Sequence, residues 1–324
     1  MNALLKGPFL ASRPFSWVNT AFPFAAAWLV AGLPLTWVFW VGVLFFLFPY
    51  NLAMYGLNDI FDYESDQKNP RKASVEGARL DKAAFRPLWI AVLICCLPFL
   101  FILLSQGGWP ARLMLLASAF AVVSYSVPPL RFKVIPFLDS TNSSLHFWTP
   151  LAYGVLVSGQ SLSTYGAALA AYFLWGLASH AFGSVQDIPF DREADIGSIG
   201  TVIGAKATVW FSTTLYLIAA LLIALAYPVT LGYGAALLCL LYLANTVRFH
   251  GITDETSPTA NAGWKVFLAL NMATGAYLTA AYLTGTVSLP LVMVPVIAGV
   301  TGIVFYAYLV RGTKSDGLSS LPRR

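Results

Sequence analysis

The sequence predicts an all-α fold, a polytopic bundle of transmembrane helices around an intramembrane cavity. Three observations predict it. Hydrophobic residues make up 58% of the 324 residues and charged residues only 10%, whereas soluble domains average about 25% charged residues. The apolar residues form stretches near the roughly 20 residues that a bilayer requires. Eight of the 14 acidic residues fall in two short windows, which solvation of an ordinary surface does not explain.

Ten apolar stretches are expected to span the membrane in order along the chain. Pro128 and Pro129 should end the fourth of them, because the residue before a proline is biased away from helix. We expect one integral-membrane domain over 1–324, with 311–324 as a flexible cytoplasmic tail. The ten stretches are 15–34, 36–57, 87–105, 111–128, 142–159, 163–184, 207–227, 230–248, 264–284 and 288–310.

The basic residues indicate how the bundle is oriented. With the N-terminus in the cytoplasm, 18 of the 19 Lys and Arg residues lie on the cytoplasmic side, and only Arg112 lies outside, as the positive-inside rule requires. All 14 acidic residues fall on the cytoplasmic side too. We therefore expect a plasma-membrane protein with a cytoplasmic N-terminus and cytoplasmic active-site loops. The net charge of +5 then reflects the membrane topology and an attraction to anionic lipid, and no nucleic-acid partner is expected.

The two acid-rich windows follow the second and sixth stretches. The acids are Asp59, Asp62, Glu64 and Asp66 in the first window, and Asp187, Asp191, Glu193 and Asp195 in the second. The three aspartates of each window are spaced to lie on one helical face. Like charges on one face repel by a few tenths of a kcal/mol per pair, so the pattern favours a bound cation. Hard oxygen ligands suit Mg²⁺, which shares its coordination with water and substrate phosphates. Because each charge at a bilayer centre costs about 2.5 to 3.5 kcal/mol, the windows belong at the cytoplasmic rim of the cavity.

Polar residues around the first window are candidates for binding substrate. Asn51 and Asn58 continue the face of Asp59 and Asp62 toward the membrane interior. Lys68, Arg71 and Lys72 lie in the loop that follows. These three cations either bind phosphate or only set the topology.

Four further residues lie near the same membrane edge. Tyr125 ends the fourth stretch and is either an interfacial anchor or a catalytic residue. Arg131 and Lys133 come directly after it and are candidates for binding substrate. His180 lies two turns before Asp187 on the same face, where it either packs by hydrogen bonding or contacts substrate.

Acid clusters at the rim of an apolar cavity suit the diphosphate ester of an isoprenoid. Its charged head would bind bridged magnesium ions, and its apolar tail would lie in the cavity. The metal neutralises the diphosphate as the carbon–oxygen bond ionises. The allylic cation must be shielded from water, and aromatic faces can stabilise it.

The segment NDIFDYESD at 58–66 resembles the NDxxDxxxD signature of the UbiA-type membrane prenyltransferases, and DIPFDREAD at 187–195 resembles their second motif. Arg13-Pro14 before the first stretch and Tyr125, Pro129 and Lys133 after the fourth also fit. The resemblance covers most of the chain. It implies a helical bundle with a lateral opening, in which two magnesium ions hold the prenyl diphosphate.

The resemblance also implies roles for the acids. Asp59, Asp62 and Asp66 would bind one metal group and Asp187, Asp191 and Asp195 the other, while Asp59, Asp62, Asp187, Asp191 and Tyr125 would be catalytic. Asn51 and Asn58 would assist. The family typically has nine spans, so the fold expectation is nine or ten.

Within that family the two segments look most like the lycopene elongases of carotenoid biosynthesis. The implied reaction transfers a dimethylallyl unit from dimethylallyl diphosphate to lycopene, with a carotenoid cyclase left open as a partner. Two alternatives are a prenyltransferase acting on an aromatic quinone precursor or on a chlorophyll-type ring. An alternative of another class is a cation-coupled transporter, because acids at matched positions of two half-repeats also mark such proteins.

Overall fold

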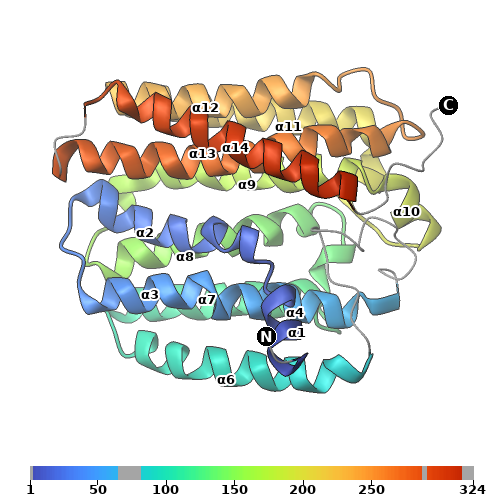
Figure 1. Ribbon diagram of the computed structural model, residues 1–324, viewed down its shortest axis with the longest axis horizontal. Helices are drawn as coiled ribbons and strands as arrows, with labels where there is room; N and C mark the ends of the chain where they lie inside the picture. Colours follow the sequence, from blue (N-terminus) through green and yellow to red (C-terminus); the bar gives the residue numbers. More distant parts are fainter. Residues whose placement is uncertain (1–2, 65–81, 287–289, 316–324) are drawn as a thin grey trace.

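A computed structural model describes residues 3–64, 82–286 and 290–315, and it shows helices packed side by side in one bundle (Figure 1). No strand occurs in these three ranges, so the all-α expectation is confirmed. The α-helices are α1 (Ala3–Ala11), α2 (Val18–Ala31), α3 (Trp37–Leu47), α4 (Pro49–Phe61), α6 (Phe85–Leu104), α7 (Trp109–Ser126), α8 (Leu138–Val157), α9 (Gly166–Val185), α10 (Ile188–Glu193), α11 (Ile199–Ala226), α12 (Thr230–Val247), α13 (Asn261–Thr286) and α14 (Met293–Ser315).

Seven helical segments in the described ranges are long and apolar enough to cross a membrane, and α2 is a shorter apolar helix. They are Trp37–Phe61, Lys82–Leu104, Leu162–Val185, Ile199–Ala226, Thr230–Val247, Ser257–Thr284 and Met293–Val310. Each of the ten stretches expected from the sequence overlaps a helix, with α3 and α4 sharing the second stretch. Helix α8 is not one of the seven segments. It carries the polar residues Asp139, Asn142 and His146, whose side chains are buried. The number of crossings stays a prediction.

The bundle is built from pairs of neighbouring helices. Helix α8 packs against α2, α7 and α9, while α11 packs against α9 and α12, and α13 packs against α14. One apolar core, which includes Phe24, Phe46 and Tyr153, fills the space among α2, α3, α4, α6, α7 and α8. A second group of buried rings, including Tyr216 and Tyr242, joins α9, α11, α12 and α13.

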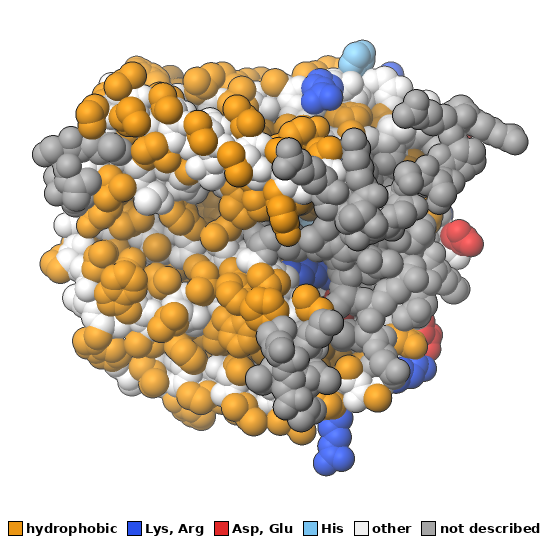
Figure 2. Space-filling model, in the orientation of Figure 1, with side chains coloured by type: hydrophobic (Ala, Val, Ile, Leu, Met, Phe, Trp, Pro, Cys, Tyr) orange, Lys and Arg blue, Asp and Glu red, His pale blue; other side chains and the backbone are white. Residues whose placement is uncertain are grey.

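The polar ends of the helices gather at one end of the bundle. Helix α10 and the C-terminal end of α4 both lie on the right in Figure 1. On the face drawn in Figure 2, apolar side chains cover the left and centre, and the coloured Asp and Glu side chains lie toward the right. This distribution agrees with an integral membrane protein whose charged chemistry is confined to one end.

Candidate active site

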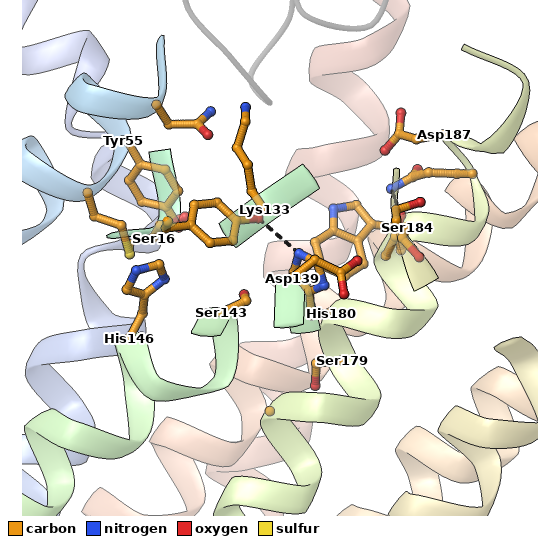
Figure 3. A pocket seen from close by; sticks show the side chains of 18 of the residues that line it. Ser16, Tyr55, Lys133, Asp139, Ser143, His146, Ser179, His180, Ser184 and Asp187 are labelled. Atoms are coloured by element: carbon orange, nitrogen blue, oxygen red, sulfur yellow. Dashed lines mark hydrogen bonds between the residues drawn. The ribbon is translucent and has the colours of Figure 1, made fainter. Parts of the chain in front are cut away.

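A cavity of about 390 Å³ opens at the polar end of the bundle, between the ends of α4, α8, α9, α10 and α13. Figure 3 shows Tyr55, Ser16 and His146 on one side of it and Asp187 and Ser184 on the other, with Lys133 between them. The cavity brings together seven of the residues that the sequence proposed as catalytic, substrate-binding or metal-binding. They are Asn58, Asp62, Tyr125, Lys133, His180, Asp187 and Asp191.

Asp59 lies next to this cavity and pairs with a cation from the segment between α1 and α2. Its side chain is buried, and Oδ1 accepts a hydrogen bond from Nη2 of Arg13 at 2.8 Å. The guanidinium carbon of Arg13 also lies 4.4 Å from the centroid of the Tyr55 ring, a cation–π contact. Arg13 lines the cavity, so its charge faces both the first acid window and any ligand there.

Asp62 ends α4 and contacts two basic side chains of the turn between α7 and α8. Lys133 forms an ion pair with Oδ1 of Asp62, and Nη2 of Arg131 lies 3.6 Å from the same atom. Burial lowers the pKa of the Lys133 ammonium to about 7, against the opposing effect of the Asp191 and Asp59 charges. The turn thus places a buried basic group directly over the first acid window.

The second acid window does not form the single helical face expected from its spacing. Helix α9 ends at Val185 and α10 runs only from Ile188 to Glu193. Asp187 and Asp191 line the cavity, but Asp195 lies beyond α10, is exposed and has a positive φ of 54°. The expectation of one face is wrong because the chain turns at both ends of α10.

Tyr125 and His180 form a hydrogen-bonded pair on the cavity wall. Oη of Tyr125 lies 3.0 Å from Nε2 of His180, and Oγ of Ser140 lies 3.0 Å from Nδ1 of the same ring. Both ring nitrogens of His180 therefore have hydroxyl partners. Figure 3 shows Asp139 directly beside His180.

Asp139 and Arg13 are cavity residues that the acid windows did not reveal. Asp139 is fully buried; Oδ1 accepts from the Ser140 N–H at 2.7 Å, and Oδ2 accepts from the Ile199 N–H at 2.9 Å. Its signal in the sequence was a lone acid at the start of a helix after a Pro-rich turn. Arg13 was noted only beside Pro14, as part of the family resemblance.

Other candidate residues lie elsewhere. Asn51 is not among the lining residues, and its Nδ2 donates to Thr20 Oγ1, Phe46 O and Leu47 O within 2.9 Å, where α3 gives way to α4. This placement favours a structural role over substrate contact. Arg131 is partly exposed and does not line the cavity. Asp66, Lys68, Arg71 and Lys72 lie outside the described residues.

A second cavity of about 470 Å³ extends from the first into the apolar part of the bundle. Its walls come mainly from apolar side chains of α2, α8, α9, α12 and α13. Asn19, Trp175 and Asn271 line both cavities. A polar compartment at the rim is therefore followed by an apolar compartment inside the bundle.

The ligand types at the rim suit Mg²⁺. Asp62, Asp187, Asp191 and Asn58 present oxygen atoms to one cavity, as this hard cation prefers. Among the described residues, no three His, Cys, Asp or Glu side chains are close enough to hold a metal by themselves. The described carboxylates come from opposite walls of the cavity, and Mg²⁺ usually shares its coordination with phosphate and water oxygens.

The fold and the site together define a membrane-embedded prenyltransferase. Residues 20–272 match the UbiA prenyltransferase family, and the chain belongs to that family.

Two relatives match most of this chain. The lycopene elongase/hydratase of Corynebacterium glutamicum is 48% identical over 271 residues, covering 83% of this chain and 94% of that protein. The C(50) beta-cyclic carotenoids biosynthesis protein LbtBC of Dietzia sp. is 49% identical over 275 residues, covering 84% of this chain and 63% of that protein.

The fold also matches solved structures. A UbiA homolog from Archaeoglobus fulgidus bound to DMAPP and Mg²⁺ superposes with a TM-score of 0.61 and 17% identity, covering 82% of this chain and 98% of that one. At this identity the likeness establishes the fold alone. Family membership favours an enzyme over the transporter alternative.

Proposed function

We propose that this protein transfers a dimethylallyl group from dimethylallyl diphosphate to lycopene in a Mg²⁺-dependent reaction of carotenoid biosynthesis. The observation that carries the proposal is the 48% identity to a lycopene elongase/hydratase over 83% of the chain. The two adjoining cavities support it, because one is lined by charges and the other by apolar side chains.

The polar cavity would hold the diphosphate. Lys133 and Arg13 line it and would donate to phosphate oxygens. Asp62, Asp187 and Asp191, with Asp59 beside them, would hold Mg²⁺. When bound, Mg²⁺ would neutralise the diphosphate as the allylic carbon–oxygen bond breaks.

The apolar cavity would hold part of the hydrocarbon acceptor. Tyr172, Tyr242 and Trp175 contribute aromatic rings to its wall, and such rings exclude water and stabilise a nearby cation. The allylic cation would add to the terminal double bond of lycopene, and the resulting tertiary cation would lose a proton or gain water.

The site would open to the cytoplasm from a protein of the plasma membrane, as the distribution of basic residues predicts. The cyclase partner stays a prediction.

Mass spectrometry of pigments from a lycopene-producing bacterium that expresses the chain tests the proposal. We expect lycopene to gain one or two five-carbon units, and the presence or absence of added water shows how the cation is resolved. Unchanged lycopene with folded protein in the membrane would overturn the carotenoid assignment. Aromatic acceptors, either quinone precursors or chlorophyll-type rings, would then be assayed with longer prenyl diphosphates.

A further inference from the structure

The pair formed by Tyr125 and His180 lies between the two compartments. Along α9, Asp187 follows the helix at the charged rim, while Trp175 borders the apolar cavity. His180 stands between them, five residues before the helix ends at Val185, which corresponds to about 8 Å of helix. The prenyl carbons of a diphosphate held at the rim would extend into this region.

The hydrogen bonds of the pair suit it for accepting a proton. A neutral imidazole carries one N–H donor and one acceptor nitrogen. Because Nε2 lies 3.0 Å from the Tyr125 hydroxyl and Nδ1 lies 3.0 Å from the Ser140 hydroxyl, the Ser140 oxygen can accept from Nδ1–H. Nε2 then accepts from Tyr125, and the Tyr125 oxygen keeps its lone pairs for the cavity.

Asp139 supplies the charge that such a step needs. Its carboxylate is fully buried and lies beside His180 (Figure 3). The backbone N–H groups of Ser140 and Ile199 donate to it at 2.7 and 2.9 Å. It also lies in the first turn of α8, where the helix dipole favours a negative charge. A fixed carboxylate next to an imidazole stabilises the imidazolium that forms when the ring takes up a proton.

We propose that Tyr125 and His180 together are the proton acceptor that ends the reaction, an inference that rests on the proposed function. After the new carbon–carbon bond has formed, the proton leaves either the carbon next to the tertiary cation or a water that adds to it. It passes to the Tyr125 oxygen while the Tyr125 proton moves to Nε2 of His180. When the proton leaves carbon, the electron pair of the broken C–H bond forms the new double bond. When the proton leaves the water, a lone pair of the water oxygen has already formed the carbon–oxygen bond, and the electron pair of the broken O–H bond stays on the oxygen of the alcohol. The imidazolium then returns its proton to the departing diphosphate.

Purified protein with dimethylallyl diphosphate and lycopene tests this role, with two products measured. Elongated carotenoid reports the complete reaction, and dimethylallyl alcohol reports ionisation followed by capture of the allylic cation by water. In His180→Gln the carboxamide still accepts from Tyr125 but has no basic nitrogen. We expect elongated product to fall by about 100-fold or more, the usual contribution of a general base, while the alcohol is maintained or rises and the KM for the donor is unchanged.

Tyr125→Phe removes a single oxygen atom and should also lower the ratio of elongated carotenoid to dimethylallyl alcohol. This second variant tests the inference if His180→Gln fails to fold. The matched control is His250→Gln, the same substitution at an exposed histidine that does not line the cavity. The product ratio of this variant should not change.

Two outcomes would overturn the inference. A wild-type product ratio in both His180→Gln and Tyr125→Phe would leave the diphosphate as the base. If the variants lose both products equally and the KM for the donor rises, Tyr125 and His180 position the donor and do not accept the proton. Wild-type protein that ionises the donor but never elongates lycopene would instead overturn the proposed function, and this inference with it.

Discussion

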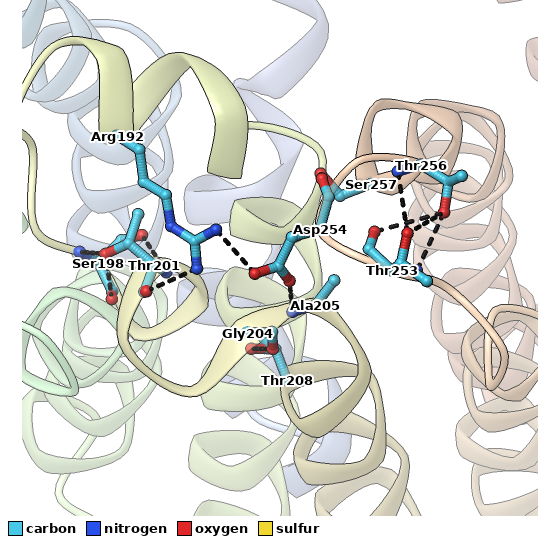
Figure 4. Close-up of polar contacts among 10 residues, drawn as sticks. All are labelled: Arg192, Ser198, Thr201, Gly204, Ala205, Thr208, Thr253, Asp254, Thr256 and Ser257. Carbon is cyan, nitrogen blue, oxygen red and sulfur yellow. Dashed lines mark hydrogen bonds and ion pairs between the residues drawn. The ribbon is translucent and has the colours of Figure 1, made fainter.

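Arg192 and Asp254 connect the second acid window to the loop between α12 and α13, because Nη1 of Arg192 lies 2.7 Å from Oδ2 of Asp254. Oδ1 of Asp254 accepts from the N–H of Ala205 at 2.7 Å, directly after Gly204, whose φ of 79° interrupts α11. Figure 4 shows this carboxylate between the Arg192 guanidinium and the break in α11. One side chain therefore joins three segments around the cavity rim.

This relationship predicts a dependence of stability on pH. The Ala205 N–H, and after it Arg192, hold the pKa of Asp254 below its usual 3.8. A lowered folded-state pKa stabilises the protein fully above the unfolded value, and that stabilisation is lost as pH falls through the folded value. We expect Asp254→Asn to melt at a lower temperature than wild type at pH 7, and the difference to shrink below about pH 4. Thermal unfolding in detergent measures it; a difference that is independent of pH would contradict the assignment.

Close packing of α9 on α8 predicts a second effect. A Cβ atom placed on Gly176 would lie 2.3 Å from Ser144 Oγ and 3.1 Å from the Ser144 Cα. The helices must separate to admit it, so Gly176→Ala should destabilise the protein by about 1 to 3 kcal/mol. Gly166→Ala, on the same helix with no atom within 4 Å of the added Cβ, is the matched control. Equal melting temperatures for the two variants would show that α8 and α9 do not pack this closely.

Much of the fold and part of the site could be predicted from the sequence. Helix positions followed from apolar length, because each segment must bury its backbone hydrogen bonds within the membrane. Asp62 and Asp187 were singled out because acids cluster there in a chain with few charges, and Tyr125 and His180 because polar residues in apolar segments are costly and stand out.

The remainder depended on contacts between distant segments. The spacing of Asp187, Asp191 and Asp195 fits a helix, but the chain turns after Glu193 and leaves Asp195 outside the cavity. Asn51 was expected on the same helical face as Asp59 and Asp62. Its amide instead donates hydrogen bonds to backbone carbonyls where α3 ends and α4 begins. Asp139 could not be linked to His180, because only the packing of α8 on α9 brings them together.

The ion pair of Arg13 and Asp59 predicts a large loss of stability on removing one partner. Their side chains are 13% and 1% exposed and lie 2.8 Å apart. Breaking a buried pair costs about 3 to 5 kcal/mol, because the remaining charge stays buried and has lost that partner. We expect Arg13→Leu to show such a loss at neutral pH, and the double variant with Asp59→Leu to recover part of it. Denaturation with a chelator present measures both; additive losses would mean that the pair is not coupled.

The placement of the acids also predicts how metal dependence divides between Asp187 and Asp195. Asp187 lines the cavity, whereas Asp195 is exposed and lies outside it. Asp187→Asn removes one charge with little change in shape, and we expect turnover to fall by at least about 100-fold, since a metal contributes several kcal/mol of transition-state stabilisation. Asp195→Asn should keep most of the activity.

Chelation should abolish the activity of the wild type, and added Mg²⁺ should restore it. The Mg²⁺ concentration needed for half-maximal activity should be lower for the wild type than for Asp187→Asn. Unfolding curves of the variants show whether a loss of turnover reflects a loss of fold. Full activity of folded Asp187→Asn would remove Asp187 from the proposed metal site. A loss in Asp195→Asn equal to that in Asp187→Asn would instead mean that the segment after α10 folds inward when substrate and metal bind, as the spacing of the three aspartates first suggested.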